Sequence, residues 1–269
     1  MITKGEINKI GRQHQIGDDQ IEKDYVITWM LYGIAQNNTL RKALAFKGGT
    51  VLKKVYFKDY RFSEDMDFTL LNEGLTNEQI ISVFNEMLEF VQDETGMTLR
   101  MNTEKDKDHK ETNSFKFFID YVAPLQGAFG SRDLKVDVTR KETLEFDLVD
   151  KNVFSEYSDL DKKFTVKCYS LSEVLIEKMA AVMGRTIPRD VYDLWYLLEV
   201  DAMNLEDHIQ EFERKAVNKG QKPELFLEKF NAKENIYHRD WQNSLKPQIQ
   251  DLPDFKDVVR ALKKHFRKL

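Results

Sequence analysis

Segments that read as β-strands end near residue 168 of this 269-residue chain. Before that point, short runs alternate apolar and polar residues or are rich in β-branched and aromatic residues, as in a strand with one buried face. The clearest are "DMDFTLL" (65–71), "SFKFFIDYV" (114–122), "LKVDVTR" (134–140) and "FTVKCY" (164–169). Beyond them, the apolar residues have helical spacing. The sequence therefore predicts an α+β fold, a mixed sheet with helices, followed by an all-helical C-terminal lobe.

The expected domain boundary lies at this change of pattern. We expect an α+β domain with N-terminal helices over residues 1–168 and a helical domain over residues 169–269. Two short strands are also expected in the first domain, "ALAF" (43–46) and "MTLRMN" (97–102). The charged stretch "EKDKDHK" (104–110) is expected to be a turn, because runs of charge favour solvent.

Two adjacent glycines, Gly48 and Gly49, separate a strand-like segment from the start of a helix. Backbone N–H groups at such a junction can bind an anion, and the missing Cβ lets a phosphate approach closely. Hydroxyls at Thr50 and Ser63 add polar groups. Positive charge nearby comes from Lys47, Lys53, Lys54 and Arg61. A tight turn without a ligand is the alternative for a glycine pair on its own.

A pair of carboxylates follows on one strand. Strand alternation points Asp65, Asp67 and Thr69 to one face and their apolar neighbours to the core. Neighbouring carboxylates repel each other unless a cation lies between them, and Mg²⁺ is commonly held by one or two carboxylates plus substrate phosphates. A solvated strand face is the alternative interpretation.

A third carboxylate interrupts the valine-rich strand "LKVDVT", where Asp137 shares a face with Lys135 and Thr139. Aspartate is depleted in β-strands, so its presence in this strand suggests a functional role. If this strand lies beside the strand of Asp65 and Asp67, Asp137 would bind a second metal ion or accept a proton from an attacking hydroxyl. Without that adjacency it is an exposed residue.

The helical part supplies a second group of charged residues. Lys178 and Arg185 are seven residues apart and share one helix face, while Asp190 and Asp193 are three apart and share another. Apolar neighbours predict that the stem of Lys178 is partly buried. Its ammonium group then either reaches a triphosphate or pairs with Asp193 across the turn at Pro188.

Composition limits the other possibilities. A net charge of −5 gives no general attraction for nucleic acid, so the basic C-terminal residues are either a local patch or, more simply, a solvated helix face: Arg260, Lys263, Lys264, Arg267 and Lys268. The single cysteine, Cys168, excludes an intrachain disulfide and a cysteine-based zinc site. The start of the chain lacks the apolar core of a signal peptide, and no run is long enough to span a bilayer. We expect a cytoplasmic protein with no membrane partner.

Taken together, these segments resemble the AbiEii family of nucleotidyltransferase toxins, which belongs to the polymerase-β-like nucleotidyltransferase superfamily and is similar to the MenT toxins. The resemblance covers most of residues 20–200 and rests on an ordered set of motifs. These are "EKDYVI" (22–27), "FKGGTVLKKVY" (46–56), "RFSEDMDF" (61–68), "KVDVT" (135–139), "LSEVLIEKMAAVMGR" (171–185) and "PRDVYDLWYLL" (188–198). It implies a nucleotidyltransferase-like mixed sheet.

The resemblance also implies roles for individual residues. The metal ligands would be Asp65, Asp67 and Asp137. The catalytic residues would be these three together with Lys178 and Asp193. The nucleotide would be bound by Gly48, Gly49, Thr50, Ser63, Lys178, Arg185 and Asp190. The interval from Gly49 to Asp65 is longer than in most of the superfamily, which leaves the base preference open.

The activity implied by the resemblance is Mg²⁺-dependent transfer of a nucleotide from a nucleoside triphosphate to RNA. The expected acceptor is the 3′ end of tRNA, which would block translation and limit phage infection. The expected partner is a cognate antitoxin with a winged-helix DNA-binding domain, which need not bind the toxin directly. Two alternatives are transfer to a small molecule or protein and a non-catalytic protein that binds nucleotide or RNA.

Overall fold

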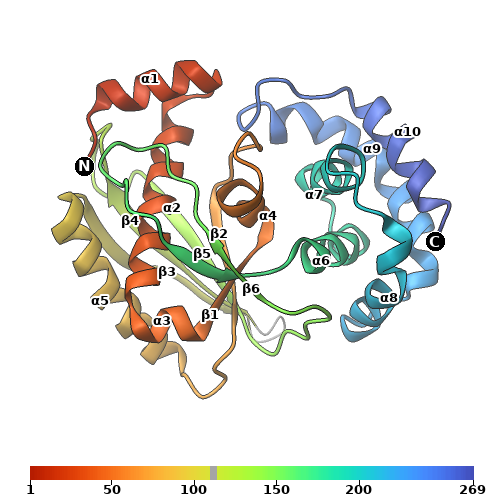
Figure 1. The fold of residues 1–269 in the computed structure, drawn as a ribbon, viewed down its shortest axis with the longest axis horizontal. Helices are drawn as coiled ribbons and strands as arrows, with labels where there is room; N and C mark the ends of the chain where they lie inside the picture. The colour runs from red at the N-terminus through yellow and green to blue at the C-terminus, as the bar shows by residue number, and fades with distance from the viewer. Residues whose placement is uncertain (110–113) are drawn as a thin grey trace. The chain divides into compact units, whose positions relative to one another are not determined.

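A mixed β-sheet organises the first of the two units in the protein, which is shown as a computed structural model in Figure 1. The structure describes residues 1–109 and 114–269. The first unit comprises residues 1–142 and 148–168, and the second comprises 143–147 and 169–269. Residues 143–147 therefore belong to the second unit although they precede the change of pattern at 168.

Within the described residues, seven strands form this sheet, in the order β3-β4-β5-β2-β1-β7-β6. Two neighbouring pairs, β2 with β5 and β1 with β7, run parallel, and the other pairs are antiparallel. The bounds are β1 Leu44–Lys47, β2 Asp65–Leu70, β3 Thr98–His109, β4 Ser114–Val122, β5 Asp133–Thr139, β6 Val149–Asn152 and β7 Thr165–Cys168.

Helices of the first unit pack on the sheet and on each other. They are α1 Lys4–His14, α2 Asp18–Gln36, α3 Asn38–Ala43, α4 Gly48–Val51 and α5 Asn77–Thr95, with a π-helical turn at Leu52–Tyr56 that continues α4. Alternate residues of β2 and β5 are buried, among them Met66, Phe68, Val136 and Val138. This alternation leaves the other side chains of β2 and β5 free to carry charge.

The second unit is helical. Its elements are α6 Leu171–Gly184, α7 Pro188–Trp195 with a π-helical turn at Tyr196–Val200, α8 Ile209–Asn218, α9 Phe226–Leu245 and α10 Phe255–Phe266, with short 3₁₀ turns at Leu205–His208 and Pro223–Leu225. Buried aromatic rings of α8, α9 and α10 meet in its core, where Phe226 contacts both Phe212 and Phe266 edge to face. The predicted α+β fold followed by a helical region is confirmed.

One local prediction was wrong, and one strand was missed. Residues 104–109 continue β3 and are not a turn, because this stretch pairs with the apolar start of β4, with Asp108 opposite Phe115; Lys110 lies outside the described residues. Strand β6 was not predicted at all. Its sequence, "VDKN", has one apolar residue, and as an edge strand it needs no alternation to pair with β7.

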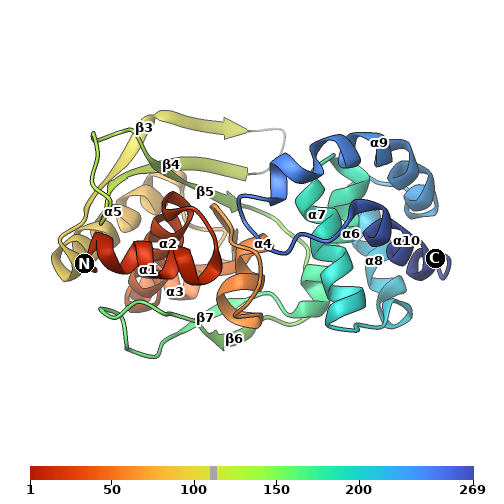
Figure 2. The same ribbon diagram turned by 90° about the horizontal axis from the view of Figure 1, so that it is seen from above.

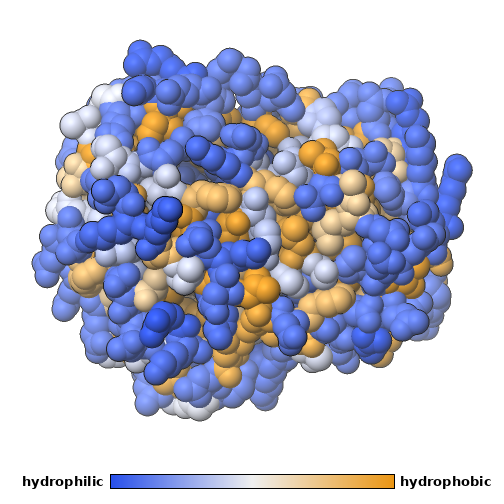
Figure 3. Space-filling model, in the orientation of Figure 1, coloured by the Kyte–Doolittle hydropathy of each residue, from blue (hydrophilic) through white to orange (hydrophobic). Residues whose placement is uncertain are grey.

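Surface polarity follows the composition. Hydrophilic side chains cover most of the face drawn in Figure 3. Across the part of the chain that the structure describes, no helix has the length and apolar character needed to cross a membrane.

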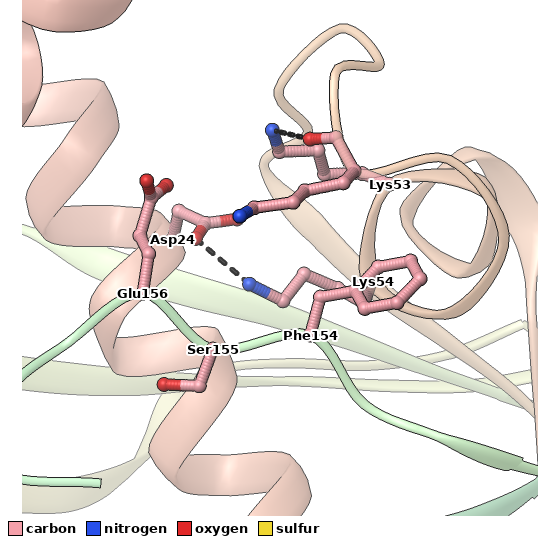
Figure 4. Close-up of a pocket in the computed structure, with 7 residues that line it drawn as sticks. Asp24, Lys53, Lys54, Phe154, Ser155 and Glu156 are labelled. Atoms are coloured by element: carbon pink, nitrogen blue, oxygen red, sulfur yellow. Dashed lines mark hydrogen bonds and ion pairs between the residues drawn. The ribbon is translucent and has the colours of Figure 1, made fainter. Parts of the chain in front are cut away.

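Two lysines that follow the glycine pair are directed into the first unit and not toward a phosphate. Lys54 Nζ donates a hydrogen bond to Asp24 Oδ2 at 2.8 Å (Figure 4). It also donates to Thr28 Oγ1 at 2.8 Å, and Tyr157 donates its hydroxyl to the same Asp24 oxygen. Lys53 Nζ donates to the carbonyl oxygen of Lys58 at 2.7 Å. The expectation that Lys53 and Lys54 supply charge to an anion site is therefore wrong.

The buried ion pair between Asp24 and Lys54 instead joins α2 to the π-helical turn that follows α4. Burial raises the pKa of Asp24, but the charges of Lys54 and Lys53 and the hydrogen bonds from Lys54 and Tyr157 outweigh burial, so the pKa lies below its ordinary value. The stabilisation is present above the unfolded-state pKa of about 3.9 and is lost as the pH falls through the folded-state pKa.

Lys54→Met should lower the free energy of unfolding by about 3–5 kcal/mol at pH 7, because it leaves Asp24 buried without its cation. The double variant Asp24→Leu/Lys54→Met should recover most of this loss. Urea unfolding at pH 7 measures both. A single variant within 0.5 kcal/mol of wild type, on the order of an ordinary surface change, would show that the pair does not hold these elements together.

Candidate active site

Parallel pairing of β2 with β5 brings the three predicted aspartates together. The register places Asp67 directly opposite Asp137 and Asp65 opposite Lys135. All three carboxylates are half-buried on the face opposite the core residues. The adjacency on which a role for Asp137 depended is therefore present. Thr69, which was expected on the same face, is buried.

Lysines flank the aspartates along the same rows. One row crosses four strands, with Lys47 on β1, Asp67 on β2, Asp137 on β5 and Lys116 on β4 opposite one another in turn. Lys116 Nζ lies 3.5 Å from Asp137 Oδ2, and in the next row Lys135 Nζ lies 3.7 Å from Asp65 Oδ2.

Lys116 was not predicted as a neighbour of the aspartates, although the sequence indicates that it lies on the polar face of its strand. It is the only basic residue of "SFKFFIDYV", and the alternation of that strand places it on the polar face.

The carboxylate group carries an incompletely compensated negative charge. Burial raises the pKa of Asp67 to about 6, and the charges of Asp65 and Asp137 add to this effect, while Lys47 and Lys135 oppose it. Asp137 Oδ1 is buried and has no hydrogen-bond partner among the described residues. A raised carboxylate pKa and an unsatisfied carboxylate oxygen are both relieved by a bound cation.

The donor set fits a magnesium ion that also binds substrate. Among the residues that the structure describes, no group of three or more His, Cys, Asp or Glu side chains could hold a metal ion by itself. Mg²⁺ usually takes only one or two protein carboxylates and completes its shell with water and substrate phosphates. Asp65, Asp67 and Asp137 supply oxygens of this kind, and the unpartnered Asp137 Oδ1 is available to such an ion.

The Gly48–Gly49 pair at the junction of β1 and α4, here called the glycine turn, directly borders the aspartates. Gly48 has a φ of +80°, in the left-handed region, and a Cβ built there would overlap Asp67 Oδ2. Glycine at this position thus gives the Asp67 carboxylate its place, whatever else the turn binds. The residue before Gly48, Lys47, is buried, and its Nζ lies 3.6 Å from Glu142 Oε2. Gly49 is buried.

The two predicted hydroxyls position the strand of Asp65. Thr50 donates to the carbonyl oxygen of Asp65 at 2.5 Å, and the hydroxyls of Thr50 and Ser63 lie 2.7 Å apart and share a hydrogen bond. Gln20 on α2 donates to the carbonyl oxygen of Ser63 at 3.0 Å. These bonds fasten the segment before β2 to both α4 and α2. Arg61, earlier in the same segment, is buried.

A second cluster lies in the helical unit and contains all four charged residues predicted there. Lys178 Nζ lies 2.8 Å from Asp190 Oδ1 and 2.7 Å from Asp193 Oδ2, so the pairing with Asp193 is the alternative that this structure realises. Arg185, half exposed, adds two hydrogen bonds to Asp190. Burial raises the pKa of Asp190, but Lys178 and Arg185 outweigh it, and the pKa lies below its ordinary value.

The remaining candidates are structural. Three basic residues of the C-terminal segment pair with acidic side chains of the same unit: Arg260 with Asp257, Lys263 with Glu234 and Lys268 with Glu206. This supports the interpretation of that segment as a solvated helix face. Burial raises the pKa of the Cys168 thiol to about 12, which makes it inert as a nucleophile.

Asp67→Asn should stabilise the metal-free protein at pH 7.5 by about 1–2 kcal/mol, allowing for screening at a half-buried site. Because the folded-state pKa of Asp67 exceeds the unfolded value of about 3.9, the wild type loses stability as the pH rises toward 6 and beyond, and the variant does not. The gain should vanish near pH 4. Urea unfolding in EDTA from pH 4 to 8 measures it, and parallel pH profiles for the two proteins would contradict the charge assignment.

Comparisons with known proteins identify the family and the fold of the chain. The family model "Nucleotidyl transferase AbiEii toxin, Type IV TA system" matches residues 29–264. No curated protein matches the chain. MenT4, a nucleotidyltransferase toxin from Mycobacterium tuberculosis, is 15% identical with a TM-score of 0.64, over 100% of this chain and 89% of that one.

JHP933 from Helicobacter pylori is 15% identical with a TM-score of 0.57, over 94% of each chain. At this identity the solved structures show the fold alone, and they confirm the expected nucleotidyltransferase-like fold. Because the family model spans most of the sequence, the chain belongs to the AbiEii family of nucleotidyltransferase toxins of type IV toxin–antitoxin systems.

Proposed function

We propose that this protein transfers a nucleotide from a nucleoside triphosphate to the 3′ hydroxyl of an RNA, with tRNA as the acceptor, and thereby blocks translation. The observation that carries the proposal is the direct opposition of Asp67 and Asp137 on parallel strands, with Asp137 Oδ1 lacking a hydrogen-bond partner among the described residues. Membership of a nucleotidyltransferase toxin family supports it.

In this proposal the aspartates of the sheet hold Mg²⁺ and direct the attacking hydroxyl. Asp65, Asp67 and Asp137 are the ligands, and the ion, when bound, neutralises charge on the phosphates. Asp137 accepts the proton of the attacking hydroxyl at the carboxylate oxygen that does not bind the ion. Gly48 keeps the Asp67 carboxylate in place, and the Thr50–Ser63 hydrogen bond fixes the approach to β2.

The helical cluster supplies the positive charge for the departing phosphates. Lys178 and Arg185 bind the triphosphate, and Asp190 and Asp193 keep their side chains oriented through the ion pairs at 2.7–2.8 Å. A tRNA acceptor places the activity in the cytoplasm. The partner expected for a toxin of this family is an antitoxin, and a winged-helix antitoxin that need not bind the toxin belongs to the proposal.

The direct assay mixes the protein with Mg²⁺, each labelled nucleoside triphosphate and total tRNA, and separates the products on a gel. Label on tRNA supports the proposal. Label on a protein or small molecule instead would assign a different acceptor, and binding of nucleotide without any transfer would assign a non-catalytic role.

Asp67→Asn should lower transfer by about 10³-fold or more, because it removes charge where transition-state charge is stabilised. Asp150→Asn is a matched control, since Asp150 is an exposed aspartate on β6 of the same sheet. It should retain wild-type transfer. If Asp67→Asn retains full transfer while folded, the catalytic assignment fails.

Lys178→Met should weaken triphosphate binding about tenfold or more, as expected when a charged hydrogen bond is removed. Lys215→Met is its control, because Lys215 is also buried in the helical unit and pairs with Glu173 at 2.8 Å. Both variants lose a buried ion pair, but only the first should change the affinity for a fluorescent triphosphate analogue at low temperature. Equal effects would make the role of Lys178 purely structural.

A further inference from the structure

We propose that Lys116, Lys135 and Phe118 form a subsite for the acceptor, and that the acceptor strand is single-stranded polynucleotide. The lysines contact its phosphodiester groups and the phenyl ring stacks on a base. The proposal rests on the proposed function, because it assigns the second substrate of the same site.

The three side chains are neighbours on one face of the sheet. Lys116 and Phe118 are two residues apart on β4 and therefore point to the same side. Phe118 lies opposite Lys135 of β5, and Lys116 lies opposite Asp137. The views in Figures 1 and 2 both show β4 next to β5. All three side chains are half-buried, with 28% of Lys116 and 33% of Lys135 exposed.

Strand order places this group on the acceptor side of the aspartates. The order β4-β5-β2-β1 puts the aspartates between β4 and the glycine turn that follows β1. In phosphoryl transfer the attacking and leaving oxygens lie roughly in line on opposite sides of the phosphorus. We place the phosphates of the nucleotide at Gly48 and Gly49, as the motif predicts, so the pyrophosphate leaves on the β1 side. The attacking hydroxyl then arrives from the side of β4 and β5.

The charges of the group suit a polyanion. The ammonium groups of Lys116 and Lys135 lie 3.5 Å and 3.7 Å from the nearest carboxylate oxygens, too far for strong hydrogen bonds. Their donors therefore remain available to phosphate oxygens. A divalent cation at the carboxylates would offset the charges of Asp65 and Asp137, which lie nearest to these two lysines, and would leave both ammonium groups to a phosphate.

The aromatic residue points to a nucleic acid strand over a small or peptide acceptor. Single-stranded nucleic acid is bound by basic side chains that follow the backbone and by aromatic rings on which bases stack. Phe118 is a large apolar side chain on the polar face of β4, in the row next to the two carboxylates that face each other. Lys116 on the same strand and Lys135 on β5 lie beside this ring. The three residues therefore combine an aromatic ring with basic side chains, as in a site for single-stranded nucleic acid.

The test measures binding of a short single-stranded RNA with a 5′ fluorescein, by anisotropy, in Ca²⁺ without nucleotide and over a range of salt concentrations. Lys116→Gln/Lys135→Gln should reduce the slope of log affinity against log salt by about 1.4, or about 0.7 for each phosphate that is no longer neutralised. Replacing both residues by Arg should restore it. Phe118→Leu should weaken binding about tenfold with no change of slope.

Lys167→Ala is the matched control, because Lys167 is a half-exposed lysine on β7, beyond β1 from the aspartates. It should bind RNA as the wild type does, and every variant should bind a fluorescent triphosphate analogue with wild-type affinity. Urea unfolding confirms that the variants are folded.

Three outcomes would overturn the subsite. If the wild type binds and extends RNA but the Gln variant keeps its affinity and slope, the subsite is wrong and the proposed function stands. If the Gln variant loses triphosphate affinity in equal measure, the lysines serve the triphosphate. If the wild type transfers nucleotides without binding RNA, the RNA acceptor and the subsite fail together.

Discussion

The parallel pairing of β2 with β5 is the constraint on which the candidate site depends. Parallel strands in register set Asp67 directly against Asp137, so two carboxylates face each other at the centre of a sheet. Like charges opposite each other destabilise a sheet, and here the flanking lysines compensate only in part. The raised pKa of Asp67 and the unpartnered Asp137 oxygen are the two signs of the remaining imbalance.

In the helical unit, by contrast, the buried aspartates are paired with basic side chains. Asp190 and Asp193 share Lys178, Arg185 adds a second cation to Asp190, and the pKa of Asp190 lies below its ordinary value. This cluster is electrostatically complete without a ligand. The contrast separates a cluster whose opposite charges are paired in the absence of a ligand from a group of carboxylates that a bound cation would complete.

Much of the fold was readable from the sequence because its signals are local. Strand alternation predicted which side chains of β2 and β5 carry charge, and the loss of that pattern after residue 168 predicted the helical region. Where a tertiary contact decided the outcome, local signals failed. The charged stretch at 104–109 is a strand because β4 pairs with it, and Lys54 is buried because Asp24 on α2 offers it a partner.

The site itself was only partly predictable. Asp65, Asp67 and Asp137 were recognisable as carboxylates on strand faces, but their adjacency depends on two segments about seventy residues apart pairing in parallel, which no local pattern encodes. Lys116 was overlooked because its meaning comes from the strand beside it. For Lys178 the sequence left two alternatives, and the geometry of the turn at Pro188 realised the pairing with aspartate.

Whether the carboxylates of β2 and β5 share a cation can be observed directly. A crystal of the protein soaked with Mn²⁺ and a non-hydrolysable nucleoside triphosphate should give an anomalous scattering peak in contact with oxygens of both Asp67 and Asp137. A bound analogue with no peak at these oxygens, or with manganese held only at other acidic side chains, would contradict the account.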